Sequence, residues 1–214
     1  MAERFVPAAG RASLTRFYDV GVRLTMREHL WRPMIVEQLA SNGPRVIVDL
    51  GCGTGGLALP IAQRLPEARV IAIDGDPDIL DLARAKRGAD RVEWTHAYAD
   101  ALPVDDGSVD SVVSSLVLHH LPFATKQAAL AEARRILRPD GQLVVADWAA
   151  PQDPVMSVAF RGLQLLDGVE TTDDNRRGMI PQLIADAGFM QPLRLRRIRT
   201  LLGTFEVLLT TPDR

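Results

Sequence analysis

A short apolar run that leads directly into a cluster of glycines constrains this 214-residue chain more than any other feature. The run is Val46–Leu50, and the next six residues read Gly-Cys-Gly-Thr-Gly-Gly. A run of this length, apolar except for Asp49, is typical of a strand buried on both faces of a parallel sheet. Glycine has no Cβ, so the backbone after the strand can turn sharply and a ligand can touch it. The junction therefore predicts a site for a nucleotide-like ligand.

Short apolar runs and longer segments of helical period alternate through the rest of the chain. We predict strands at 46–50, 70–73, 92–95, 109–116 and 142–147, and helices at 55–65, 77–87 and 124–137. Asp76 is the expected N-cap of the second helix, with Pro77 at its first position. A helix at 180–187 and two further strands, 193–200 and 204–211, are expected to complete the sheet with a hairpin. This alternation is the pattern of an α/β fold built around a parallel sheet.

Two segments lie outside this pattern. Residues 1–42 precede the first strand and are predicted to form an N-terminal helical lid; a helix that packs on the sheet and buries its edge is an equally good interpretation. The main domain is expected to span 43–214. Within it, residues 151–178 mix apolar and acidic side chains, and we expect an irregular cap inserted over the carboxyl edge of the sheet.

Composition restricts the partners. The formal charge is −2, which gives no general attraction for nucleic acid, and the one cysteine, Cys52, cannot form an intramolecular disulfide. The sequence contains no run of about 18 apolar residues, so we expect no stable membrane insertion. Six arginines among apolar residues in 1–32 leave a peripheral membrane contact open. We expect a cytoplasmic monomer or homodimer that acts on a small molecule and has no nucleic-acid partner.

The glycine spacing by itself is ambiguous. Gly51, Gly53 and Gly56 match the dinucleotide-binding pattern, and Asp74 follows at the distance where that pattern has a ribose-binding acid. An NAD-dependent dehydrogenase is therefore one candidate. However, Asp49 precedes the glycines and Asp100 follows the third strand, and carboxylates suit a cation better than a pyrophosphate. S-adenosylmethionine carries a sulfonium and an ammonium, lacks phosphate, and matches these acids.

With these glycines and acids, the chain resembles the class I S-adenosylmethionine-dependent methyltransferases. The resemblance rests on DLGCGTGG, VIAIDGDP, YADALP, VDSVVSSLVLHHLP and EARRILRPDGQLVVADW, and it spans about 45–148. Within this family it is most similar to the small-molecule branch that includes ubiquinone and menaquinone biosynthesis enzymes. The resemblance implies a Rossmann-like, seven-stranded, mostly parallel sheet with helices on both faces and an antiparallel C-terminal strand.

The resemblance also implies a set of cofactor-binding residues. Asp49 would order the glycine loop, Asp74 would hold the ribose hydroxyls, and Asp100 would accept from the adenine amino group, with Leu102 packing on the ring. Each acid has a plainer interpretation, as a turn cap, a solvated strand end or a local Asx turn respectively. The implied set is Tyr18, Asp49, Gly51, Cys52, Gly53, Asp74, Gly75, Asp100, Ala101 and Ser115. Gly75 departs from the family, which often has an apolar side chain there.

The candidate transfer site follows the fourth and fifth strands. His119 and His120 are the candidate catalytic residues, because a base is needed if a hydroxyl or ammonium is methylated. A structural or supporting role for the pair is the alternative. Asp147 and Trp148 are candidate substrate residues, or else a strand-end acid beside a core indole. We expect no metal site, since neighbouring side chains should diverge and no third ligand is apparent.

The sequence therefore predicts S-adenosylmethionine-dependent methyl transfer to a small-molecule acceptor by in-line displacement. Three alternatives stay open. They are a phospholipid head-group methyltransferase, a non-catalytic S-adenosylmethionine-binding partner or sensor, and an NAD-dependent dehydrogenase.

Overall fold

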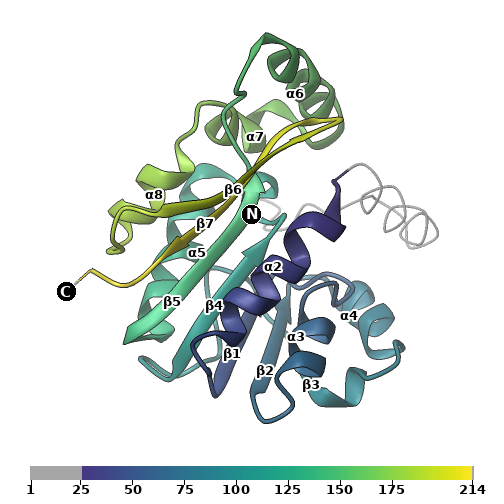
Figure 1. Ribbon diagram of the computed structural model, residues 1–214, viewed down its shortest axis with the longest axis vertical. Coiled ribbons are helices and arrows are strands. Elements are labelled where there is room, and N and C mark those ends of the chain that lie inside the picture. The colour runs from purple at the N-terminus through teal and green to yellow at the C-terminus, as the bar shows by residue number, and fades with distance from the viewer. Residues whose placement is uncertain (1–25, 214) are drawn as a thin grey trace, which may run out of the picture.

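The computed structural model describes residues 26–213, and every structural statement below refers to that part of the chain (Figure 1). The strands are β1 (Val46–Leu50), β2 (Arg69–Asp74), β3 (Val92–His96), β4 (Val109–Ser115), β5 (Leu137–Trp148), β6 (Leu193–Thr200) and β7 (Gly203–Thr210). The helices are α2 (Glu28–Ala40), α3 (Ala58–Arg64), α4 (Pro77–Arg84), α5 (Phe123–Ile136), α6 (Pro154–Asp167), α7 (Val169–Arg176) and α8 (Ile180–Asp186), with short 3-10 turns η1 (Ala89–Arg91) and η2 (Leu118–His120).

The strands form one sheet in the order β3-β2-β1-β4-β5-β7-β6. All neighbouring pairs are parallel except the two that involve β7, which runs antiparallel to both β5 and β6. The predicted seven-stranded, mostly parallel sheet with an antiparallel C-terminal strand is confirmed. Because β1 leads outward to β2 and β3 while its other neighbour, β4, leads to β5, the crevice between β1 and β4 is the topological switch point where such sheets bind ligands.

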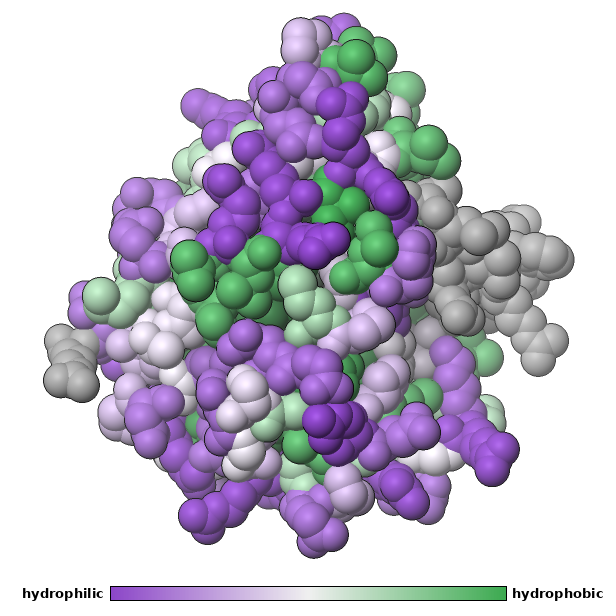
Figure 2. Space-filling model, in the orientation of Figure 1, coloured by the Kyte–Doolittle hydropathy of each residue, from purple (hydrophilic) through white to green (hydrophobic). Residues whose placement is uncertain are grey.

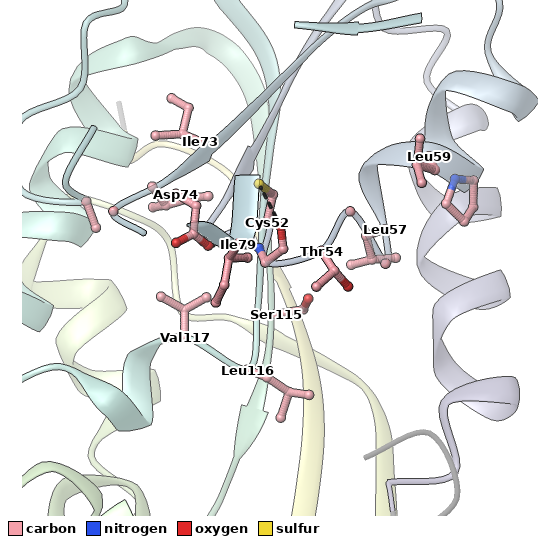
Figure 3. A pocket seen from close by; sticks show the side chains of 18 of the residues that line it. Cys52, Thr54, Leu57, Leu59, Ile73, Asp74, Ile79, Ser115, Leu116 and Val117 are labelled. Atoms are coloured by element: carbon pink, nitrogen blue, oxygen red, sulfur yellow. Dashed lines mark hydrogen bonds between the residues drawn. The ribbon is translucent and has the colours of Figure 1, made fainter. Parts of the chain in front are cut away.

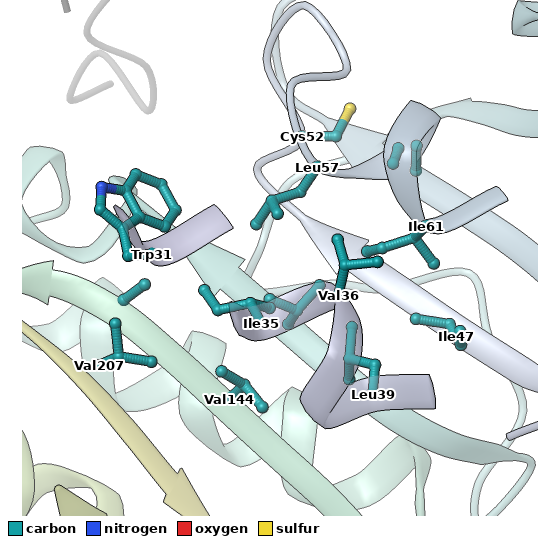
Figure 4. Packing of buried hydrophobic residues seen from close by; sticks show 14 of the residues in the cluster. Trp31, Ile35, Val36, Leu39, Ile47, Cys52, Leu57, Ile61, Val144 and Val207 are labelled. Atoms are coloured by element: carbon teal, nitrogen blue, oxygen red, sulfur yellow. The ribbon is translucent and has the colours of Figure 1, made fainter. Parts of the chain in front are cut away.

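Helices bury both faces of the sheet, as predicted. On one face, α2 contributes Trp31, Ile35 and Leu39, which pack with Ile61 of α3 against the central strands (Figure 4). On the other face, α5 and α8 pack against the opposite side of the same strands through a second apolar cluster. Strand residues that are apolar in succession therefore have a partner on each side, which explains the unbroken runs in the sequence.

Local signals place several elements correctly. Helix α4 begins at Pro77, and the Asp76 carboxylate accepts from the N–H groups of Asp78 and Ile79 at 2.9 and 3.3 Å. Helix α3 begins at Ala58, later than the predicted 55. Residues 51–57 are turns instead, because Gly51, Gly53 and Gly55 have φ angles of 71°, 53° and 80°.

Two expectations about the second half were wrong. Residues 151–178 are not irregular: they form α6 and α7, with Met156, Phe160 and Leu163 on the buried side of α6. Strand β5 begins at Leu137 and not at 142, and its pairing with β4 shifts register between Val109 and Ser111, so that residues 138–141 bulge outward. The roles of 1–42 as a lid and of 151–178 as a cap stay predictions.

The surface is mixed. Figure 2 shows a face covered mainly by hydrophilic residues, with apolar residues gathered in smaller patches between them. None of the helices within 26–213 combines the length and the apolar character needed to cross a bilayer.

Candidate cofactor and acceptor site

A pocket of about 1430 Å³ opens at the carboxyl ends of β1, β2 and β4, where the switch point lies. Its walls come from the glycine loop after β1, the ends of β2 and β4, the turn after β3 and the first turn of α2. The lining includes Glu28, Arg32, Gly51, Cys52, Gly53, Asp74, Gly75, Ile79, Tyr98, Asp100, Ser115, Leu116, Val117 and His120. Most of the predicted cofactor-binding residues are thus brought together around one cavity.

The glycines of the loop after β1 differ in how closely they approach their neighbours. A Cβ at Gly51 would lie 2.2 Å from a methyl carbon of Val117, so the β4 loop and the glycine loop pack in direct contact. At Gly53 a Cβ would meet no heavy atom within 4 Å, which leaves open space on the pocket side of the loop. Glycine at 51 is required by packing, and glycine at 53 by backbone conformation, which keeps the loop open to a ligand.

Asp74 links the loop to the pocket floor. Its Oδ2 accepts from the Gly53 N–H at 2.8 Å and its Oδ1 accepts from the Asp76 N–H at 3.0 Å. Figure 3 shows this carboxylate beside the loop that carries Cys52, with Ile79 and Val117 close by. Burial raises the pKa of Asp74, although these backbone N–H groups oppose the shift. Asp74 is therefore a pocket residue and not a solvated strand end.

Asp49 lies behind the loop and does not line the pocket. Its side chain is buried in the centre of the sheet, and neither carboxylate oxygen meets a hydrogen-bond donor with normal geometry within the described residues. Burial raises the pKa of Asp49 to about 7, and the nearby charge of Arg32 acts in the opposite direction. Arg32 reaches from α2 to the loop, where its guanidinium would overlap a Cβ at Gly56.

Arg32 is a pocket residue that the sequence interpretation missed. One guanidinium nitrogen donates to Glu28 at 2.5 Å, while Nε is buried without a hydrogen-bond partner among the described residues. The available signal was the Glu28–Arg32 spacing of four residues, which puts both charges on one side of the helix.

The turn after β3 forms the opposite wall. Tyr98, Ala99 and Asp100 line the pocket, whereas Ala101 does not. Leu102 belongs to the apolar core on the α5 side, and its N–H donates to Glu132 at 2.7 Å, so the expected packing of Leu102 on a bound ring was wrong. Gly75 and Ile79 of α4 both line the pocket, so an apolar side chain is present there although Gly75 has none.

Strand β4 ends at the pocket in a strained turn. Ser115 and Leu116 line the cavity, and Leu116 has a φ of 58°, a left-handed conformation that is costly for a branched side chain. The buried carboxylate of Asp147 holds the next turn: its Oδ2 accepts from the N–H groups of Val117 and Leu118 at 3.2 and 2.8 Å. The strain is thus stabilised from behind the pocket.

Asp147 makes further contacts that seal it from solvent. Its Oδ1 lies 2.7 Å from His119 Nδ1 and accepts from the Trp148 N–H at 2.7 Å. Asn175 of α7 donates to the same oxygen at 3.4 Å. Burial alone would raise the pKa of Asp147, but the charge and hydrogen bond of His119 outweigh it and the pKa is lowered. Asp147 and Trp148 are both buried and line a small cavity behind the turn, not the large pocket.

The two histidines differ in position. His119 is 2% exposed and does not line the pocket, whereas His120 does. Burial, with a smaller contribution from the His119 charge, lowers the pKa of His120 to about 3, so its imidazole is neutral. The expectation that the two rings diverge was wrong, because their centroids are 4.0 Å apart. Asp167 of α6 joins them, with Oδ2 3.7 Å from His119 Nε2. Tyr18 lies outside the described residues.

Comparison with known proteins agrees with this site. A family model described as a methyltransferase domain matches residues 47–141. The chain is 32% identical over 162 residues to a demethylmenaquinone methyltransferase of Deinococcus radiodurans, covering 74% of this chain and 64% of that protein. It is 31% identical over 147 residues to the ubiquinone/menaquinone biosynthesis C-methyltransferase UbiE of Citrifermentans bemidjiense, covering 66% and 60% respectively.

The fold agrees as well. The magnesium protoporphyrin IX methyltransferase of Synechocystis, solved with bound SAH, has a TM-score of 0.68 at 19% identity, covering 92% of this chain and 88% of that one. Residues 47–141 thus match a methyltransferase domain, and the described part of the chain has the fold of the class I S-adenosylmethionine-dependent methyltransferases. Within that class its sequence is similar to quinone-biosynthesis methyltransferases, and it spans 60–64% of the length of these two relatives.

Proposed function

We propose that the chain binds S-adenosylmethionine in the large pocket and transfers its methyl group to a small-molecule acceptor. The observation that carries the proposal is the Asp74 carboxylate, which faces the pocket beside the glycine loop at the switch point of the sheet. When bound, the cofactor supplies a sulfonium methyl group for in-line displacement, so the chain's tasks are alignment and exclusion of water.

The residues around the pocket fit this cofactor. Each Asp74 oxygen accepts one backbone N–H and keeps acceptor capacity for ribose hydroxyls. Asp100 would accept from the adenine amino group, and Ile79 would pack against the ring system. Arg32 would bind the carboxylate of the amino-acid end, because its positively charged side chain lines the pocket. Gly53 keeps the backbone between these groups accessible.

On the acceptor side, His120 orients the acceptor and does not remove its proton. A base whose conjugate acid has a pKa of about 3 accepts a hydrogen bond but is too weak to deprotonate a hydroxyl efficiently near neutral pH. The names of the relatives make a reduced demethylmenaquinone the first acceptor to assay, with methylation at carbon. A cytoplasmic location and a monomeric or homodimeric state are also part of the proposal.

The test combines transfer and binding. Protein is incubated with methyl-labelled S-adenosylmethionine and a reduced demethylmenaquinone analogue in detergent, and the extracted product is counted. Asp74→Ala should weaken cofactor binding by roughly 1–3 kcal/mol, the cost of losing a charged hydrogen bond. Asp78→Ala, which removes an exposed acid of α4, is the matched control. Normal cofactor binding without label transfer to that analogue or to any metabolite-extract component would leave a binding protein and not an enzyme.

A further inference from the structure

Two imidazoles and one carboxylate meet beside the acceptor end of the pocket. His119 and His120 come from η2, and Asp167 is the last residue of α6. Each offers one potential ligand atom, and these three atoms all lie within 4.8 Å of one another. Asp167 is 47 or more positions from the two adjacent histidines in sequence, so the fold and not local spacing brings it to them.

The first histidine is oriented from behind. His119 Nδ1 lies 2.7 Å from the buried Asp147 carboxylate, and the other ring nitrogen, Nε2, lies 3.7 Å from Asp167 Oδ2. A carboxylate bonded to one imidazole nitrogen while the other nitrogen is left for an ion is the usual outer arrangement of a histidine metal ligand. Asp147 is itself fixed by three backbone N–H groups, so the ring has little freedom.

Asp167 lies where a negative charge needs compensation. It ends a 14-residue helix, whose C-terminus is the negative end of the helix dipole, and its side chain is only 21% exposed. The His119 ring lies between two carboxylates: Nε2 is 3.7 Å from Asp167 Oδ2 and Nδ1 is 2.7 Å from Asp147 Oδ1. The arrangement favours a positive charge between His119, His120 and Asp167.

We propose that His119, His120 and Asp167 bind one divalent transition-metal ion. Two imidazole nitrogens and one carboxylate oxygen match the ligand preference of Zn²⁺ and of its first-row neighbours. With bonds of about 2.1 Å, ligand atoms of a tetrahedral ion lie about 3.4 Å apart, close to the 3.7 Å between His119 Nε2 and Asp167 Oδ2. Because His120 also lines the pocket, a position not filled by the protein is available to water or to an acceptor oxygen.

The inference goes beyond the proposed methyl transfer and is tested without it. Chelator-treated, dialysed protein is titrated with Zn²⁺ by calorimetry and with Co²⁺ by visible absorption. We expect one ion per chain for the wild type, and loss of that site in Asp167→Asn and in His120→Ala. Two control variants should keep the site: Asp173→Asn, which removes an acid outside the cluster, and His96→Ala, which removes an exposed histidine outside it.

The variants remain interpretable because Asn replaces Asp at 167 without a change of shape, and unfolding temperatures measured without metal verify that both fold. Absence of saturable binding at micromolar Zn²⁺ would overturn the proposal. Equal metal affinity in wild type and Asp167→Asn would overturn it as well. Metal occupancy is the readout, so neither result depends on whether methyl transfer is observed.

Discussion

The two halves of the sheet use the same device for different purposes. At the end of β2, Asp74 accepts the Gly53 N–H from the glycine loop after β1 and the Asp76 N–H from its own turn. Near the end of β5, Asp147 accepts backbone N–H groups from the turn after β4. In each case a strand-end carboxylate holds the loop that follows the neighbouring strand. Asp74 faces the pocket, whereas Asp147 is covered by His119 and Asn175.

The difference shows that what covers an acid determines its role. An acid left open to a pocket keeps acceptor capacity for a ligand, and an acid whose oxygens are all used by the protein contributes to stability. The comparison predicts that substitutions in the β4–β5 half mainly change the free energy of unfolding, while those in the β1–β2 half mainly change cofactor affinity.

The largest effect is expected for Asp147→Ala. The substitution leaves the buried donors of Leu118, Trp148 and His119 without their acceptor, so the free energy of unfolding should fall by roughly 3–5 kcal/mol. Urea denaturation measures this, with Asp140→Ala as an exposed control that should stay within about 0.5 kcal/mol. If the free energy of unfolding falls no further than in the control, Asp147 does not stabilise the turn after β4.

Asp49 should make stability depend on pH in an unusual direction. Its native pKa is about 7, above the unfolded value near 4, so the native state holds a proton that the unfolded chain releases. Its stabilising contribution is full below pH 4 and is lost as the pH rises to about 7. Asp49→Asn cannot titrate, so its stability relative to the wild type should increase by roughly 2–4 kcal/mol between pH 4.5 and 8. Urea denaturation of ligand-free protein tests this; a difference that is constant with pH contradicts it.

Two glycines of one loop should separate packing from ligand access. Gly51→Ala places a methyl group 2.2 Å from Val117 and should cost roughly 2–3 kcal/mol of stability. Gly53→Ala meets no neighbour, so its stability loss should be about 1 kcal/mol, from its left-handed backbone alone, while S-adenosylmethionine binding weakens. Thermal unfolding and calorimetry of both variants provide the comparison. Unchanged affinity in Gly53→Ala would mean that the ligand does not approach this side of the loop.

The smallest effects are expected at two helix caps, one in each half. Asp76 caps α4 and Asp153 caps α6, each by accepting a first-turn N–H at 2.9 Å. Replacement by Ala should cost about 1 kcal/mol in either case. Chemical denaturation should find the two losses similar, and a loss above 2 kcal/mol at only one cap would show that it does more than cap its helix.

The sequence predicted the β1–β2 half well because its signals are local. The bounds of β1 and the first residue of α4 follow from an apolar run that ends in glycine and from the Asp76-Pro77 pair. Helix α7 was missed because it buries Thr172 and Asn175, which are polar, and so has no apolar period to detect.

Residues of the candidate site also differ in whether the sequence could predict them. Asp74, Asp100 and the glycines follow strands directly, so their convergence at one edge of the sheet was predictable. Arg32 and Asp167 reach the site from α2 and α6, and only the packing of those helices decides where their side chains end. The ring contact between His119 and His120 depends on the 3-10 conformation of η2, which adjacency in the sequence does not specify.

We propose that the pocket over β1 and β2 is built for a sulfonium nucleoside and not for a dinucleotide. Calorimetric titration of the purified chain with S-adenosylmethionine and, separately, with NADH distinguishes the two ligands. We expect one S-adenosylmethionine site per chain and no saturable NADH binding under the same conditions. Tight NADH binding together with no heat from S-adenosylmethionine would contradict it.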